Sequence, residues 1–323
     1  MAAPSTPGVG APAPTARAGG AAREIGERRV RVRAPGEPRR VAYLYLAPAF
    51  AFYLLFAFGP LVYTTWLSFF DWDGLTVGTW TGLDNYREVF EDPGIRSSFV
   101  HSLVLIVFYA LVPCALGLFL AALIAHGRVR GVTFFRAVLF LPQTIAVVVV
   151  AIAWVWIYAP DGPLNAALDA VGLDSVSRGW LGDFTFALPA LGVVGTWIMF
   201  GLCLVLFLAG IQKIPTTLYE AARVDGAGRV REFFAVTLPG LRGELAVALT
   251  YTTILGLRTF DLVYVATSGG PGTATTVPSW LVYQNAFSTG RVGLAAAVAV
   301  VLTAIIFVVA FAITRLVDRD PSR

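Results

Sequence analysis

The chain has 323 residues, of which 57% are hydrophobic and only 14% are charged. A soluble domain usually carries about 25% charged residues, so this chain has too little polar surface to cover itself in water. A disordered chain is excluded as well, because such chains are poor in apolar residues. The net charge of +4 comes mostly from arginines clustered between apolar runs, which does not indicate a nucleic-acid-binding surface. The composition predicts an integral membrane protein.

Residues 1–40 are predicted to be a disordered cytoplasmic tail. The segment contains eight arginines and three glutamates among Ala, Pro and Gly, with almost no large apolar residue. Such a segment cannot bury enough apolar area to offset the entropy lost on ordering. The tail could lie on anionic lipid through its arginines, or be an extension without a function.

Six apolar segments follow in a transmembrane domain predicted over residues 41–316. A helix needs about 20 apolar residues to cross a bilayer, and five segments contain uncharged runs of that length. The fifth in chain order is interrupted by Arg258 and Asp261. No segment alternates as a membrane β-barrel would, so the predicted fold class is an all-α, polytopic membrane protein. The predicted spans cover residues 43–69, 99–125, 136–158, 186–210, 245–266 and 292–314.

The connections between these spans alternate in charge. The connections at residues 126–136 and 211–243 and both termini are rich in Arg, whereas residues 71–96 and 161–183 carry six and four acidic residues. Because positively charged connections stay on the cytoplasmic side, both termini are predicted to be cytoplasmic. The expected location is the bacterial cytoplasmic membrane.

The connection over residues 213–242 is predicted to form a pair of short helices. Thr217 and Glu220 have the spacing of a capping box, so the first helix is expected to begin near Thr217. Asp225-Gly226 is typical of a helix end, because Gly adopts the left-handed conformation there. Leu238-Pro239 is expected to end the second helix. Such a pair suits docking to a soluble partner, although a linker lying on the surface fits the same pattern.

The residue order in this connection resembles the EAA loop of ATP-binding-cassette (ABC) importer permeases. Glu220-Ala221-Ala222 is followed by Gly226 and, after nine residues, by Val236 and Leu238-Pro239. The rest of residues 41–316 resembles the carbohydrate permeases of the maltose and glycerol-phosphate type. The motifs that carry this resemblance are Arg136, Leu141-Pro142, Trp154, Trp156, Gly162, Asn165, Ala209-Gly210-Ile211-Gln212, Ile214-Pro215 and Gly269-Gly270-Pro271.

The resemblance implies a type I importer permease fold and a non-catalytic subunit that forms half of a sugar path. It implies as partners a second permease subunit, two ATPase subunits and an extracytoplasmic substrate-binding protein. The chain itself would hold no metal and no cofactor, since ATP and Mg²⁺ would bind the ATPase subunits. The coupling residues that it implies are Glu220, Ala221, Ala222, Asp225, Gly226 and Pro239.

The same resemblance places a substrate path on the helices before the EAA loop and before the Gly-Gly-Pro sequence. Each set of residues shares one helix face. Most of these residues are small or apolar, whereas a dehydrated sugar needs hydrogen-bond partners. The partner permease, or Thr196, Trp197 and Tyr251, would then supply them; the alternative is that the set only packs helices together. The implied path residues are Gly195, Ile198, Met199, Leu202, Thr252, Gly256 and Thr259.

Two other functional classes gain less support. A membrane-embedded enzyme needs a cluster of acids, histidines or a nucleophile within the spans. A stand-alone secondary carrier or channel needs its own coupling or gating charges. Arg258 and Asp261 are the only charges deep in a predicted span, where their spacing permits either a gate or a structural ion pair on one helix face. Cys114 and Cys203 lie in apolar runs and are expected to be small core residues.

Overall fold

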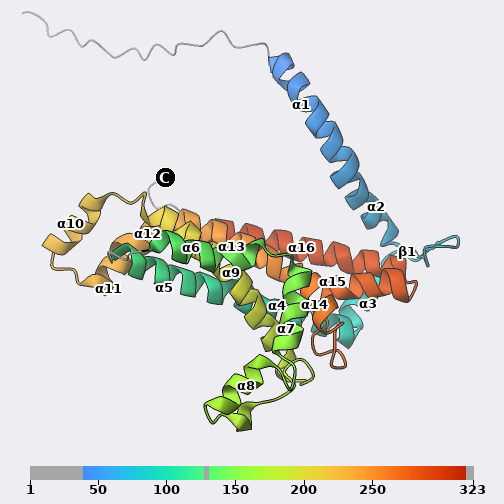
Figure 1. The fold of residues 1–323 in the computed structure, drawn as a ribbon. Coiled ribbons are helices and arrows are strands. Elements are labelled where there is room, and N and C mark those ends of the chain that lie inside the picture. Colours follow the sequence, from blue (N-terminus) through green and yellow to red (C-terminus); the bar gives the residue numbers. More distant parts are fainter. Residues whose placement is uncertain (1–38, 127–130, 318–323) are drawn as a thin grey trace, which may run out of the picture. The chain divides into compact units, whose positions relative to one another are not determined.

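The computed structural model describes residues 39–126 and 131–317, which are mostly helical (Figure 1). The chain divides into two compact units, Met1–Leu54 and Leu55–Arg323. The predicted tail, residues 1–40, lies outside the described residues except for Arg39 and Arg40, where α1 begins.

Four described helical runs are long and apolar enough to cross a membrane, and up to six if each of two bent helix pairs is one span. The four are Tyr43–Leu67, Pro93–Ala125, Ala187–Ile211 and Val292–Leu316. Each of them overlaps one of the spans predicted from hydropathy. The bent pairs are Phe134–Thr144 with Val147–Ile157, at 97°, and Arg229–Gly240 with Arg242–Leu257, at 70°.

The first half of the chain is a series of helices with one short hairpin. Asp92 is the N-cap of α4. Its carboxylate accepts a hydrogen bond from the Ile95 amide at 2.8 Å, and Pro93 occupies the first turn of the helix. The elements in order are α1 (Arg39–Tyr53), a π-helical turn (Leu54–Phe58), α2 (Gly59–Leu67), β1 (Phe70–Asp71), β2 (Thr79–Trp80), α3 (Asp84–Glu91), α4 (Pro93–Ile106), a second π-helical turn (Val107–Leu111) and α5 (Val112–His126). β1 and β2 pair antiparallel, with Phe70 opposite Trp80.

The third predicted span is broken into two helices. α6 (Val132–Thr144) contains Pro142 near its end and stops where Ile145 adopts an extended conformation. α7 (Val147–Ile157) then starts in a new direction. The outer connection that follows contains α8 (Pro163–Ala170) and a 3₁₀ turn (Asp174–Val176).

α9 (Ala187–Ile211) is the central helix of the second unit, and 15 of its 25 residues are buried. It packs against α5, α6 and α13 (Figure 1). Glycines allow these helices to approach closely: a Cβ atom added at Gly201 would lie 1.9 Å from the Leu139 carbonyl oxygen on α6. Cys114 on α5 and Cys203 on α9 are both buried, with their sulfur atoms 3.6 Å apart, as the core assignment predicts.

The connection after α9 forms a helix pair, as predicted, but one detail differs. α10 (Thr216–Val224) starts one residue earlier than expected; Pro215 is its N-cap and no side chain caps it, so the capping box of Thr217 and Glu220 does not form. Leu238 and Pro239 lie in the last turn of the second helical segment, Arg229–Gly240, as predicted. The other elements of this connection are α11 (Arg229–Glu232), a π-helical turn (Phe233–Thr237) and α12 (Leu238–Gly240).

The fifth predicted span is also interrupted. α13 (Arg242–Leu257) ends at Arg258, and α14 (Asp261–Ala266) begins three residues later. α15 (Pro278–Tyr283), a π-helical turn (Gln284–Ser288) and α16 (Val292–Val317) complete the described chain. α16 packs on α13, and Arg291 at its start pairs with Glu88 of α3 at 2.7 Å. This ion pair raises the pKa of the Arg291 guanidinium.

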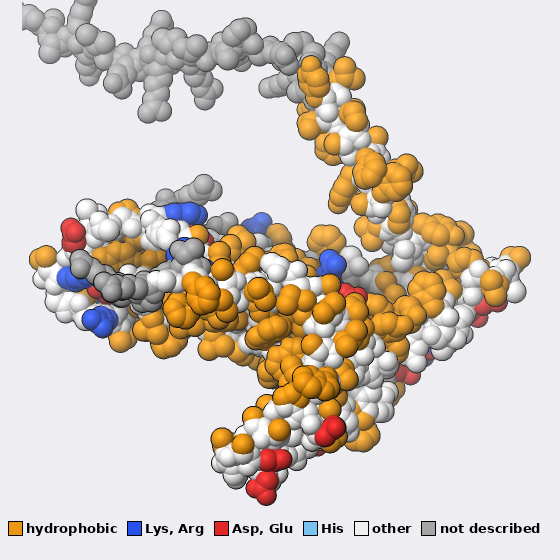
Figure 2. All heavy atoms as spheres, viewed as in Figure 1, with side chains coloured by type: hydrophobic (Ala, Val, Ile, Leu, Met, Phe, Trp, Pro, Cys, Tyr) orange, Lys and Arg blue, Asp and Glu red, His pale blue; other side chains and the backbone are white. Residues whose placement is uncertain are grey.

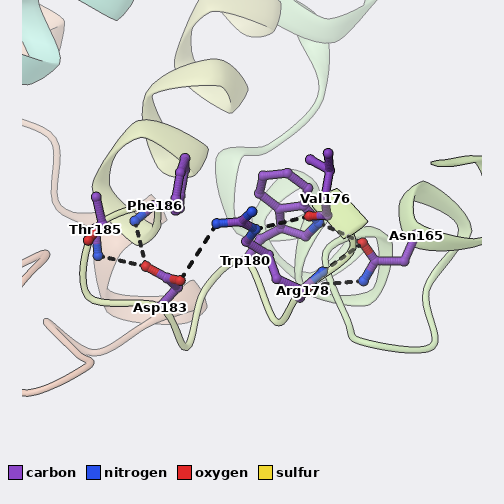
Figure 3. Close-up of polar contacts among 7 residues, drawn as sticks. All are labelled: Asn165, Val176, Arg178, Trp180, Asp183, Thr185 and Phe186. Carbon is purple, nitrogen blue, oxygen red and sulfur yellow. Dashed lines mark hydrogen bonds and ion pairs between the residues drawn. The ribbon is translucent and has the colours of Figure 1, made fainter. Parts of the chain in front are cut away.

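Asn165 organises the outer connection between α7 and α9 (Figure 3). Its side chain is 2% exposed; its amide nitrogen donates to three carbonyl oxygens, those of Ala159, Pro160 and Arg178. Its amide oxygen accepts from the Arg178 backbone and from the Trp180 indole at 2.9 Å. One amide therefore satisfies polar groups from both sides of the loop.

Gly201→Ala should lower the free energy of unfolding by about 3 kcal/mol, because the added methyl group meets backbone that cannot rotate away. Thermal unfolding of the solubilised protein measures the change. The control is Gly243→Ala on α13, where no atom lies within 4 Å of the new methyl group. It should leave stability unchanged or raise it by up to about 1 kcal/mol, and equal effects of the two substitutions would contradict the packing described for α9.

Asn165→Asp should open the outer connection, because a carboxylate keeps the acceptor but cannot donate to the three carbonyl groups. Hydrogen exchange in this connection should accelerate on the order of tenfold. Ser177→Ala is the control, since it removes only an exposed bond to Asp169. Hydrogen exchange in the outer connection of this control variant should stay within about twofold of that in the unaltered chain.

Candidate functional site

The connection between α9 and α13, here called the coupling loop (residues 213–242), projects from one end of the helices it joins (Figure 1). α10 ends as predicted: Gly226 adopts φ +75°, the Ala227 amide donates to the Ala222 carbonyl at 2.9 Å, and the Gly226 amide donates to Arg223 at 3.0 Å. This is the Schellman arrangement, and it requires a left-handed residue at position 226.

An ion pair joins the two halves of the coupling loop. The Arg223 guanidinium on α10 makes two hydrogen bonds to the Glu232 carboxylate on α11, at 3.1 and 3.2 Å. Glu232 is 2% exposed, and the pairing raises the pKa of Arg223. A second contact joins the Tyr219 and Thr237 hydroxyls at 3.2 Å. Paired, charge-assisted bonds of this kind fix orientation as well as distance, so α10 and α11 form one structural unit.

The predicted coupling residues lie mostly on the accessible side of this unit. Glu220, Ala221, Asp225 and Gly226 are exposed, whereas Ala222 and Pro239 are half-buried. The Arg223–Glu232 pair had not been identified from the sequence, where the only signal is a pair of opposite charges nine residues apart. Lys213 adds a third tie, because its ammonium group pairs with Glu244 at the start of α13, at 2.9 Å.

A cleft of about 570 Å³ separates α10 from the ends of α5, α6 and α9. Glu220 and Arg223 line it from the coupling loop, and Arg136 lines it from α6. The Nε atom of Arg136 is buried there and has no hydrogen-bond partner among the described residues. The cleft leaves one flank of α10 open between the loop and the helix ends.

A second cavity, of about 440 Å³, lies among α6, α7, α9, α13 and α14 and is here called the central cavity. The break between α6 and α7 and the break between α13 and α14 both contribute residues to it. Its walls mix aromatic, aliphatic, charged and amide side chains. The lining residues are Tyr109, Gln143, Ile145, Val147, Ile198, Met199, Tyr251, Leu255, Arg258, Thr259, Phe260, Asp261 and Leu262.

The central cavity includes three of the seven path residues implied by the sequence, namely Ile198, Met199 and Thr259. Of the other four, Leu202 is half-buried and does not line it, and Thr252 donates its hydroxyl to the Ala248 carbonyl of its own helix. Gly195 and Gly256 face the ring and Cβ of Tyr109; an added Cβ would lie 2.1 Å and 3.0 Å from that side chain. For these two glycines the packing alternative describes the structure better.

Of the three additional candidates, only Tyr251 lines the central cavity. Thr196 donates its hydroxyl to the Phe108 carbonyl at 2.6 Å, which ties α9 to the π-helical turn between α4 and α5. Trp197 lies edge-on against Trp154, with ring centroids 5.7 Å apart.

The ion pair that the spacing of Arg258 and Asp261 permits on one helix face does not form. Arg258 follows the last residue of α13 and Asp261 is the first residue of α14, so the two side chains do not share a helix. Both are exposed to the central cavity, and neither forms an ion pair with another described residue. Within residues 39–126 and 131–317, no three His, Cys, Asp or Glu side chains gather as they would around a metal ion.

On the face drawn in Figure 2, Lys and Arg lie mainly at the end that carries α10 and α11. Acidic side chains lie over the connection that contains α8 and also near β1 and α3. This separation has the signs predicted for the cytoplasmic and outer connections.

The chain was compared with known proteins. The profile of the family described as "Binding-protein-dependent transport system inner membrane component" matches residues 114–323. The chain is 38% identical to the probable ABC transporter permease protein YurN of Bacillus subtilis, over 81% of this chain and 90% of YurN. It is 33% identical to the diacetylchitobiose uptake system permease protein NgcF of Streptomyces coelicolor, over 85% of this chain and 81% of NgcF.

A solved structure has the same fold. It is the crystal structure of a bacterial ABC transporter involved in the import of the acidic polysaccharide alginate, with a TM-score of 0.74 and 23% identity, over 88% of this chain and 96% of that chain. The all-α, type I importer permease fold expected from the sequence is confirmed. The profile match and the two relatives show that the chain is a multi-pass membrane protein of the binding-protein-dependent transport system inner membrane component family.

Proposed function

We propose that this chain is the permease subunit of an ATP-driven sugar importer, forming half of the translocation path and coupling to a cytoplasmic ATPase through residues 213–242. The observation that carries the proposal is the coupling loop. It is a pre-formed helix pair, held by the Arg223–Glu232 ion pair, in which Glu220 and Ala221 are exposed. A sugar is proposed because the name of NgcF assigns diacetylchitobiose to that relative.

The partners of the proposed complex follow from this role. They are a second permease subunit, two ATPase subunits that hold ATP and Mg²⁺, and an extracytoplasmic substrate-binding protein. In this arrangement the chain itself hydrolyses nothing and holds no cofactor, and both of its termini lie in the cytoplasm. Exposed Ala221 lets the backbone of α10 come close to a partner, and Glu220 offers a carboxylate to a basic group there.

Reconstitution tests the proposed function. The chain is purified with its neighbours from the membrane and placed in liposomes with and without a co-purifying ATPase. Uptake of radiolabelled diacetylchitobiose, maltose or trehalose should require the ATPase, ATP and the binding protein. Uptake by liposomes that contain this chain alone would instead support the alternative, a stand-alone secondary carrier or channel.

Gly226→Val should uncouple ATP hydrolysis from transport. A β-branched residue at φ +75° is strained, and the end of α10 would have to rearrange. ATPase activity stimulated by the loaded binding protein should fall on the order of tenfold or more, because α10 would no longer present the same face. The amount of inserted protein should not change, since nothing lies within 4 Å of the added Cβ.

Gly228→Ala is the matched control for this substitution. Gly228 also has no neighbour within 4 Å of an added Cβ, but its φ is −72°, which any residue adopts. Equal loss of coupling in the two variants would show that the left-handed turn is not what matters.

Arg223→Gln should weaken coupling more than Arg223→Gln combined with Glu232→Gln. The single change takes the charged partner away from the buried Glu232 carboxylate. The double change instead leaves two neutral amides at positions 223 and 232. The single variant should lose stimulated ATPase activity about tenfold and the double variant should regain part of it. Arg231→Gln, the same change at an exposed residue of α11, is the control and should leave coupling within about twofold.

A further inference from the structure

An apolar groove of about 650 Å³ lies between α5 and the second half of the coupling loop, and it is here called the α5 groove. Its first wall is one face of α5, where the lining residues recur every three or four positions. This wall consists of Ala115, Leu118, Phe119, Ala122 and Leu123. The second wall, on α11 and the π-helical turn after it, consists of Arg229, Val230, Phe233 and Phe234.

The apolar side chains of the α5 groove are not covered by the described chain. Phe119, Val230 and Phe234 are 61%, 73% and 61% exposed. Phe233 packs edge-on against Phe234, with ring centroids 5.1 Å apart, which makes the wall on the coupling loop mostly aromatic. Exposed apolar side chains gathered in one groove mark a surface that an apolar partner covers.

The position of the α5 groove along its helix matches the depth of one lipid leaflet. α5 is the second part of Pro93–Ala125, a helical run long and apolar enough to cross a membrane. From Ala115 to Ala125 the helix rises ~15 Å at 1.5 Å per residue. The hydrocarbon core of a bilayer is ~30 Å thick, so each leaflet supplies ~15 Å of acyl chain. The groove therefore lies where the acyl chains of the leaflet beside the coupling loop end at their headgroups.

Arg229 gives the α5 groove a positive charge that no described residue neutralises. It is the only charged residue in the lining among the described residues; it is exposed and forms no ion pair with another of them. Glu232, the acidic residue of α11, is instead held by two hydrogen bonds from Arg223. The Arg229 guanidinium is therefore available to an external anion, and its planar fork fits two phosphate oxygens.

An anionic phospholipid combines the two features that the α5 groove requires. Its acyl chain fits an apolar wall at membrane depth, and its phosphate fits a guanidinium beside that wall. Anionic lipids are enriched in the cytoplasmic leaflet, where they attract Arg and Lys near the surface. A zwitterionic lipid offers the same acyl chains without the net negative charge, so the charge of Arg229 favours the anionic one.

We propose that the α5 groove binds one anionic phospholipid, with an acyl chain along α5 and its phosphate at Arg229. The assignment to the cytoplasmic leaflet rests on the proposed function, which places the coupling loop on that side. The lipid would contact a membrane-crossing helix and the coupling loop at once, and would so hold the second half of the loop against the membrane.

Photolabelling of the assembled, solubilised complex tests the site. The probe is phosphatidylglycerol with a diazirine on one acyl chain, and the labelled peptides are mapped by mass spectrometry. The probe should label the segments that contain residues 115–123 and 229–234. Unlabelled phosphatidylglycerol should compete about fivefold better than phosphatidylcholine with the same acyl chains. Glycerol 3-phosphate at the same concentration should not compete, because it has the phosphate without the acyl chain.

Arg229→Gln tests the role of the charge. It should remove the preference of about fivefold for phosphatidylglycerol over phosphatidylcholine while labelling of the groove continues. Arg231→Gln is the matched control, because Arg231 is an exposed arginine of the same helix that does not line the groove. It should leave the preference within about twofold of that of the unaltered complex.

Ala115→Trp tests the role of the apolar wall. Ala115 is exposed, so an indole there fills the groove without entering the packed core, and labelling should fall about tenfold. Leu116→Trp, at the next exposed residue of α5 and outside the groove, is the control. It should leave labelling within about twofold.

The other outcomes would overturn the site. Labelling spread evenly over the membrane-crossing helices, or equal competition by the two lipids, would show only the lipid that surrounds any membrane protein. Protection of the groove from every lipid in the assembled complex would show that a protein partner covers it. ATP-dependent sugar uptake in the same preparation decides the proposed function separately. A complex that transports sugar without labelling of the groove keeps the importer and loses the lipid site.

Discussion

Backbone hydrogen bonding is the constraint on which the rest of this structure depends. In lipid no water replaces a missing partner, so a crossing segment has to be helical along its length. The described spans obey this rule, and the exceptions are few. Backbone leaves the helix beside the central cavity where α6 meets α7 and where α13 meets α14, whereas the bend between Gly240 and Arg242 lies at the end of the coupling loop. The cavity is the part of the second unit in which a break can be hydrated or filled by a ligand.

Outside the spans the same requirement is met by side chains. Asn165 of α8 satisfies three carbonyl groups, a backbone amide and an indole in the outer connection. Arg223 and Glu232 do the equivalent work in the coupling loop with charge-assisted bonds. Both networks give short connections a defined shape, although neither connection has a large apolar core of its own. Defined shape is what a connection needs if it is to contact a partner in one orientation.

Hydropathy and charge alone predicted the all-α class, because a run of about 20 apolar residues has few other solutions in lipid. They did not predict the breaks. Ile145 and Phe260 are themselves apolar, so hydropathy treated residues 136–158 and 245–266 each as one span, although Pro142 stands beside the first break and Arg258 and Asp261 stand beside the second. Of the two alternatives for Arg258 and Asp261, the structural ion pair assumed an unbroken helix, and it does not form for that reason. The capping box at Thr217 failed similarly, since Pro215 is the N-cap and α10 starts one residue earlier.

Local packing, which a sequence pattern does not show, also explains which of the implied path residues line the central cavity. Positions 195 and 256 share a helix face with residues that line it, but both are glycines and accept the side chain of Tyr109 instead. A helical wheel shows the direction in which each side chain points, but it does not show how large the side chain packed against that face is. Gln143 could not be selected from the wheel of either implied helix, because it belongs to α6 and comes to the cavity only through the bend after Thr144.

The two sites are linked by continuous helices. α9 runs without interruption from Met199, in the wall of the central cavity, to Ile211 at the start of the coupling loop, about 18 Å away at 1.5 Å per residue. α13 leads back from Glu244 to Arg258, at the other side of the cavity, and the Lys213–Glu244 ion pair ties the loop ends of both helices together. A helix transmits displacement along its axis because its hydrogen bonds resist stretching. A force applied to the coupling loop therefore acts on two helices of the cavity wall at once, and the breaks beside the cavity are where the chain can yield to it.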